Sequence, residues 1–188
     1  VENHKNLIHV SIHAGVGAGI ILDHHLYTGL AGTAGEAGHM IVQPGGRSCP
    51  CGNHGCLEQY ISEPAVLSRY RELSGRTTVS IDDLVWAYNQ KETAALAVTD
   101  EFTTYLACGI NNLWNLFSPE CIILNSQLTA YLPQLLPEIL QKLSPRFRAT
   151  CHLKLSTLQD TGVLLGAARV CISKYLGTEK LYFSGLQP

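Results

Sequence analysis

One segment of the chain, Gly35–Glu58, has the sequence GEAGHMIVQPGGRSCPCGNHGCLE. It places three of the chain's seven cysteines within eight residues, with glycine or proline beside each of them. Thiolates separated by tight turns are the usual ligands of a structural zinc ion. The segment therefore predicts a zinc knuckle over residues 39–56, with the carboxylates of Glu36 and Glu58 on either side of it.

The spacing Cys49-x-Cys51 followed by Cys56 supplies three thiolates from one loop. Zinc needs a fourth ligand to complete a tetrahedron, and His39 and His54 are both candidates. We expect His39, because His54 lies between two ligands and would have to fold back on its own loop. A closed Cys3His set leaves no position for a reactive water, so the predicted zinc is structural and not catalytic.

A disulfide and plain burial are the alternative interpretations of these cysteines. The cytoplasmic character of the sequence disfavours the first, and the density of glycine disfavours the second. Zinc binding is worth roughly 10–16 kcal/mol in small sites, so removing the metal should disorder the loop. The four remaining cysteines stand singly among apolar residues, and we expect them to be small buried hydrophobic side chains: Cys108, Cys121, Cys151 and Cys171.

Composition narrows the class of protein. The 188 residues are 46% hydrophobic, which is enough to bury the core of one domain. A net charge of -2, without any run of basic residues, argues against direct nucleic-acid binding. The sequence has no apolar run of membrane-spanning length and no secretion signal, so we expect a cytoplasmic protein without a membrane partner.

The pattern of the remaining chain indicates strands alternating with helices. Two β-rich runs flank a glycine-rich connection, His13–Ala18, which resembles a phosphate-binding loop except that a strand, not a helix, follows it. Helices are expected at 62–74, 80–89, 93–117, 133–143 and 162–176, and strands at 7–12, 19–22, 26–27, 121–124 and 150–155. In the longest helix, one face is expected to be buried from Leu96 to Phe117. This alternation predicts an α/β sandwich.

The two glutamates allow two interpretations. Carboxylates and an imidazole held on a rigid loop would form fixed acceptors, which suit the vicinal hydroxyls of a sugar. Alternatively, Glu36 and Glu58 are ordinary solvated or helix-capping residues, and spacing alone does not separate the two.

The strings Gly35–His39 and Cys49–Glu58 resemble the signature of the ROK family of bacterial repressors and sugar kinases. The resemblance covers nearly the whole chain and implies an α/β, actin-like ATPase (ribonuclease H-like) lobe with an inserted zinc knuckle. It implies that zinc is bound by His39, Cys49, Cys51 and Cys56, and that the sugar is contacted by Glu36, His39 and Glu58.

Two departures from the kinase members favour the regulator branch, typified by the N-acetylglucosamine repressor. The glycine hairpin begins with His13-Ala14, and the strand near the expected nucleotide site is followed by Asn125-Ser126 where kinases have a glycine pair. The resemblance further implies that the catalytic aspartate, the first phosphate loop and any helix-turn-helix lie outside this C-terminal portion. We therefore expect no catalytic residue in this chain, no ATP as cofactor, and DNA contact only through a domain absent from it.

The resulting hypothesis is that residues 1–188 form one sugar-binding and zinc-binding lobe of a ROK transcriptional regulator. The ligand is expected to be a hexose or an N-acetylhexosamine, and the protein a homodimer or tetramer. The alternatives are an ATP-dependent sugar kinase, such as a glucokinase or N-acetylhexosamine kinase, and a fragment without ligand that zinc alone holds together.

Overall fold

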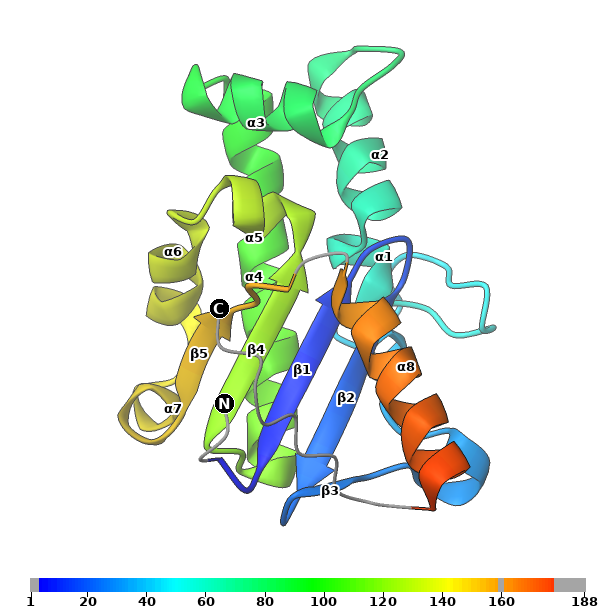
Figure 1. The fold of residues 1–188 in the computed structure, drawn as a ribbon. Helices are drawn as coiled ribbons and strands as arrows, with labels where there is room; N and C mark the ends of the chain where they lie inside the picture. Colours follow the sequence, from blue (N-terminus) through cyan, green and yellow to red (C-terminus); the bar gives the residue numbers. More distant parts are fainter. Residues whose placement is uncertain (1–3, 159–160, 178–188) are drawn as a thin grey trace. The chain divides into compact units, whose positions relative to one another are not determined.

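The computed structural model describes residues 4–158 and 161–177. The chain divides into two compact units, Val1–Ser156 and Thr157–Pro188. The first unit contains a five-stranded sheet in the order β3-β2-β1-β4-β5, with β1 at its centre (Figure 1). The strands are β1 (Leu7–Ile12), β2 (Val16–Leu22), β3 (His25–Leu26), β4 (Cys121–Ser126) and β5 (His152–Leu155).

β1 pairs antiparallel with β2 and parallel with β4, and β4 pairs parallel with β5. Side chains alternate between the two faces of a strand, and in β1 one face carries Ile8, Val10 and Ile12, all at most 2% exposed. The parallel register sets Ile12 beside Ser126. The carboxyl ends of these two strands therefore lie together at one edge of the sheet.

Helices form most of the remaining first unit. They are α1 (Glu58–Ile61), α2 (Glu63–Ser74), α3 (Ile81–Asn89), α4 (Thr93–Phe117), α5 (Gln127–Tyr131), α6 (Leu135–Lys142) and α7 (Pro145–Thr150), with two short 3-10 turns, η1 (Leu30–Gly32) and η2 (Ala37–His39). The long helix α4 buries Phe102, Leu106 and Ile110 in the same core as the apolar face of β1, and it runs along one face of the sheet (Figure 1).

The helix ends follow the capping residues that the sequence predicts. Ser62 caps α2 by accepting from the Ala65 N–H, and Gly75 ends the same helix in the left-handed conformation. Ser80 and Asp83 form a capping box at the start of α3. The predicted bounds of α4, residues 93–117, are confirmed without change.

Other expectations were wrong or incomplete. Leu96 is 40% exposed and does not belong to the buried face of α4. Of the four single cysteines, Cys121 and Cys151 are buried, whereas Cys108 is half-buried and Cys171 is exposed. The short helices α1, α5 and α7 were not predicted, because they have only 4–6 residues and no full apolar period.

The bounds of several predicted elements also change. The second strand starts at Val16 and not at Gly19, and the predicted strand at 26–27 is the two-residue β3. β5 is shorter than predicted, because residues 145–150 are helical. The second unit contains α8 (Thr161–Leu176), close to the predicted helix at 162–176. Within the described residues, no helix combines the length and the apolar character that crossing a bilayer requires.

Candidate metal centre and adjoining carboxylates

The metal loop, residues 39–56, is folded back on itself by its own backbone. Isolated bridges join Ile41 to Cys56 and Ser48 to His54. The Cys49 N–H donates to the carbonyl of Asn53 at 2.9 Å. These contacts bring the two ends of the loop together.

Gly55 shows why the loop needs glycine. Its φ is +84°, and a Cβ atom at this position would lie 1.7 Å from the carbonyl oxygen of Gln43. The Gly55 carbonyl in turn accepts from the N–H groups of Val42 and Gln43. Only a residue without a side chain allows the two strands of the loop to approach so closely.

Four side chains converge inside the loop. The ligand atoms of His39, Cys49, Cys51 and Cys56 all lie within 4.8 Å of one another. The Cys51 and Cys56 sulfurs are 3.6 Å apart, close to the roughly 3.8 Å that two thiolates adopt around a tetrahedral zinc with Zn–S bonds of about 2.3 Å. The donor set therefore fits a zinc ion. His54, the other candidate ligand, is exposed and does not join this group.

The three thiols differ in acidity. A hydrogen bond from the Asn53 backbone, followed by one from the Cys49 side chain, lowers the pKa of Cys51 to about 7. Burial raises the pKa of Cys56 to about 12 and also raises the pKa of Cys49. Cys51 is thus the first thiolate available to a metal, since zinc binds the deprotonated sulfur.

Glu36 and Glu58 lie on the two sides of the His39 ring. Nδ1 of His39 is 3.6 Å from Cys49 Sγ and 3.8 Å from Glu58 Oε1, whereas Nε2 is 3.9 Å from Glu36 Oε2. One ring nitrogen therefore faces the cysteines and the other faces away from them. The side chain of Glu36 is 68% exposed, whereas that of Glu58 is 18% exposed and accepts from the Cys49 thiol at 3.2 Å.

Glycines bring this group against the sheet. A Cβ atom on Gly35 would lie 1.9 Å from the Ala18 carbonyl oxygen, and one on Gly38 would lie 2.4 Å from that of Val16. The segment that carries Glu36 and His39 therefore lies directly on β2. On the neighbouring hairpin, a Cβ atom on Gly15 would lie 3.7 Å from the Glu58 carboxylate.

The structure adds two residues that sequence reasoning did not assign to a site, Glu63 and Asn125. Nδ1 of His13 lies 3.5 Å from Glu63 Oε1, and its Nε2 lies 3.4 Å from the Asn125 amide nitrogen. The sequence pattern places Glu63 only in the first turn of the helix predicted at 62–74. The unusual His13 at the head of the glycine hairpin was the available signal, but its partners are 50 and 112 positions away and no local pattern names them.

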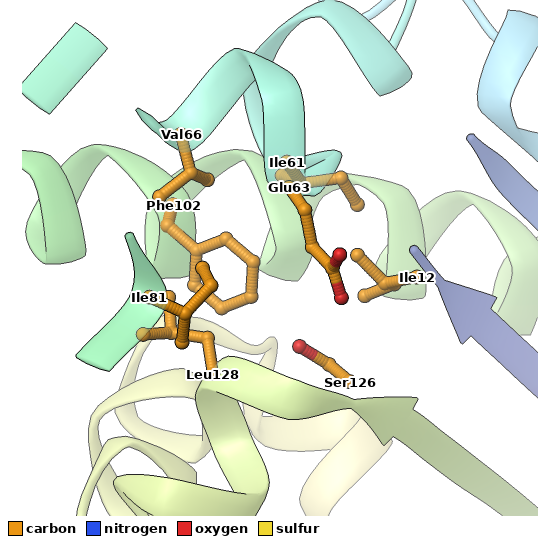
Figure 2. Close-up of a pocket in the computed structure, with 8 residues that line it drawn as sticks. All are labelled: Ile12, Ile61, Glu63, Val66, Ile81, Phe102, Ser126 and Leu128. Atoms are coloured by element: carbon orange, nitrogen blue, oxygen red, sulfur yellow. The ribbon is translucent and has the colours of Figure 1, made fainter. Parts of the chain in front are cut away.

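A narrow hollow lies behind Glu63 (Figure 2). Its lining is largely apolar, and within it the Glu63 carboxylate and the Ser126 hydroxyl point toward each other. The lining residues are Ile12, Ile61, Glu63, Val66, Ile81, Phe102, Ser126 and Leu128. The hollow is too small for a water molecule, and the candidate sugar residues do not line it. It is a packing gap and not a ligand pocket.

Comparison with known proteins places the chain in a family. The model of the ROK family matches residues 1–174, and the chain belongs to that family. The crystal structure of a ROK family transcriptional regulator, a homologue of the E. coli MLC protein, superposes with a TM-score of 0.68 at 31% identity, covering 80% of this chain and 41% of that one. The predicted actin-like ATPase fold with a knuckle that fits zinc is thereby confirmed.

Individual relatives include both branches of the family. The xylose repressor of Bacillus spizizenii is 33% identical over 184 residues, 96% of this chain and 47% of the repressor. The E. coli DNA-binding transcriptional dual regulator NagC is 34% identical over 143 residues, which are 72% of this chain and 35% of NagC. The glucokinase of Halalkalibacterium halodurans is 30% identical over 181 residues, which are 86% of this chain and 55% of the glucokinase. The chain thus spans about half the length of the curated relatives that it matches.

Proposed function

We propose that this chain is the sugar-sensing lobe of a ROK transcriptional regulator. In this proposal His39, Cys49, Cys51 and Cys56 hold a structural zinc, and Glu36, His39 and Glu58 contact the sugar. The observation that carries the proposal is the position of the His39 ring, with Nδ1 toward Cys49 and Nε2 toward Glu36. The similarity to the xylose repressor and NagC also supports it.

The chemistry of these groups suits a sugar. A bound zinc supplies a crosslink that fixes the loop. His39 would ligate it through Nδ1, which leaves Nε2–H to donate to a hydroxyl group, as expected for a metal-ligating imidazole with a second partner. The carboxylates of Glu36 and Glu58 would accept from neighbouring hydroxyl groups, and an analogue without one of these hydroxyls leaves a partly buried charge unpaired.

The expected ligand is a hexose or an N-acetylhexosamine, and the names of the xylose repressors add a pentose to the candidates. We propose that the sugar bridges residues 1–188, as one lobe, to a second lobe outside this chain and changes the angle between them. In a cytoplasmic homodimer or tetramer, that change would alter the operator affinity of a separate DNA-binding domain of the full-length protein.

Isothermal titration of the full-length protein with xylose, glucose and N-acetylglucosamine tests the proposal. At least one of these sugars should bind. Glu58→Gln should lower the affinity for that sugar by about tenfold or more, because a charged hydrogen bond is worth roughly 1.5–3 kcal/mol. Asp82→Asn is the matched control, since Asp82 is exposed on α3 and its loss should leave affinity unchanged. Unaltered binding by Glu58→Gln would remove Glu58 from the site.

An ATP-dependent sugar kinase is the second candidate, favoured by the similarity to glucokinases. The full-length protein should separate the two in an assay that couples ADP release to a colour change. A regulator should give no sugar-dependent ADP, whereas sustained turnover with any sugar of the panel would establish the kinase.

A further inference from the structure

The edge of the sheet next to Glu58 has two features that elsewhere favour anions. The hairpin between β1 and β2 turns at residues 13–15, and the twelve-residue helix α2 begins beside it. Free N–H groups at the start of a helix, together with the helix dipole, attract phosphate groups. Whether this edge can take a phosphate therefore depends on which N–H groups remain free.

The first turn of α2 has none to offer. The Glu63 N–H donates to the His13 carbonyl at 2.9 Å, and Pro64 has no N–H. The Ala65 N–H donates to the Ser62 hydroxyl, and the Ser62 N–H donates to the Glu58 carbonyl at 3.1 Å. The four groups that usually lack partners at a helix start are all satisfied or missing.

The negative charge that the N-terminus of α2 attracts is also already supplied by the chain itself. The Glu63 carboxylate stands at the first position of α2, where an external anion would gain most from the helix dipole. The nearby imidazole of His13 faces this carboxylate at 3.5 Å, and its other nitrogen faces Asn125. Both ring nitrogens of His13 therefore already have neighbours.

No lysine or arginine that the structure describes pairs with the carboxylates of this site. Among the described residues, lysine and arginine side chains form no ion pair with Glu36, Glu58 or Glu63. Arg47, although part of the metal loop, directs its guanidinium to Glu101. Three thiolates around a zinc dication would add no positive charge either. The site thus carries three carboxylates, and the start of α2 beside it is already hydrogen-bonded.

We propose that this site selects an uncharged sugar over its phosphorylated forms, and that Glu63 contributes to the selection by occupying the place of a phosphate. The inference rests on the proposed function and deepens it. A phosphate group carries about -1.5 to -2 charges at pH 7. It would meet the carboxylates of Glu58 and Glu63, without a free N–H group from the first turn of α2 and without a lysine or arginine of the described residues paired to either carboxylate.

The test uses the full-length protein and matched pairs of ligands. Glucose and N-acetylglucosamine are titrated beside glucose 6-phosphate and N-acetylglucosamine 6-phosphate, with inorganic phosphate as a separate probe. The phosphorylated member of a pair that binds should be weaker by about tenfold or more, which corresponds to roughly 1.4 kcal/mol. Glu63→Gln keeps the shape of the side chain and removes its charge. It should reduce the ratio of the two affinities, parent sugar over sugar phosphate, at least severalfold. Glu72→Gln removes the same charge from the far end of α2 and should not change the ratio.

The outcomes are distinguishable. If a sugar phosphate binds as tightly as its parent sugar, the inference is wrong while the proposed function stands. If the ratio is the same in Glu63→Gln and in the natural protein, Glu63 is not its determinant. If no sugar of either kind binds, xylose included, the proposed function fails and the inference fails with it.

Discussion

The guanidinium of Arg47 binds the carboxylate of Glu101 and thereby fastens the metal loop to α4. The same guanidinium donates to the Gln59 carbonyl at 2.7 Å and lies 4.6 Å from the centre of the Tyr60 ring. Glu101 also accepts from Arg69 of α2 at 3.1 Å. One partly buried network therefore joins the loop to two helices, independently of any metal.

Replacing Arg47 should destabilise the protein whether or not zinc is bound. We expect Arg47→Gln to lower the free energy of unfolding by roughly 1.5–3 kcal/mol, because it removes charged hydrogen bonds and leaves Glu101 with one partner fewer. Arg47→Lys should recover only part of this loss, since an ammonium group cannot form the planar fork. Urea unfolding with and without a chelator measures both effects.

Arg71 provides the control for charge removal. It lies in the last turn of α2 with an exposed side chain, and Arg71→Gln should stay within about 0.5 kcal/mol of the natural protein. An equal loss in the two glutamine variants would mean that the Arg47 network contributes nothing specific.

Substitutions at two glycines of the metal loop should distinguish the cost of backbone strain from the cost of a steric clash. Gly45 has a φ of +71° and open space at its Cβ position, whereas Gly55 has a φ of +84° and no space. Gly45→Ala should cost about 1–2 kcal/mol, the usual penalty for a left-handed residue with a side chain. Gly55→Ala should cost clearly more, because the loop must open. Thermal unfolding of the zinc-bound forms checks this order, and equal shifts in melting temperature would contradict it.

Local signals made much of the fold predictable from the sequence. The long helix α4 has a sustained apolar period, and the serines at 62 and 80 are strong helix caps. The close spacing of Cys49, Cys51 and Cys56 is also a local signal, because a short loop necessarily holds the three side chains near one another. The short helix α5 has no side-chain cap, and α7 has a serine cap but too few residues for an apolar period, so local signals alone do not predict either helix.

The partners of His13 could not be predicted because they depend on tertiary structure. Glu63 reaches it only because α1 and α2 return the chain to the hairpin, and Asn125 only because β4 pairs with β1 in register. The exposure of Leu96 has a similar cause, since periodicity shows which positions share a face but not where the neighbouring elements end. The sugar-contacting roles of Glu36, His39 and Glu58 remain predictions.

Ser126 should be replaceable without cost. Its hydroxyl is buried and makes no hydrogen bond within the described part of the chain. Ser126→Ala removes a buried unpaired polar group, so the free energy of unfolding should stay the same or rise by up to about 1 kcal/mol. Thr129→Val is the matched comparison, because the Thr129 hydroxyl donates to the Ser126 carbonyl at 3.2 Å, and its loss should cost about 1 kcal/mol. Destabilisation by Ser126→Ala would reveal a partner for this hydroxyl.

Zinc binding should release protons and strengthen as the pH rises. Without metal, the raised pKa values of Cys49 and Cys56 keep both as thiols near neutrality, while Cys51, with a pKa of about 7, is partly ionised. Each thiol must lose its proton to bind, so the three cysteines should contribute roughly three released protons per zinc at pH 6 and about two at pH 8. The affinity should therefore increase across this range.

Calorimetric titration of the metal-free protein in buffers of different ionisation enthalpy counts these protons. Cys51→Ser should lose most of the affinity for zinc. Because Cys51 supplies the additional proton at pH 6, the number of protons released at that pH should also fall by about one. Cys108→Ser is the control, because Cys108 lies on α4 outside the group of four ligands and should bind zinc as the natural protein does. Binding that releases no proton at any pH would show that the thiols are not the ligands, since a neutral thiol is a poor partner for zinc.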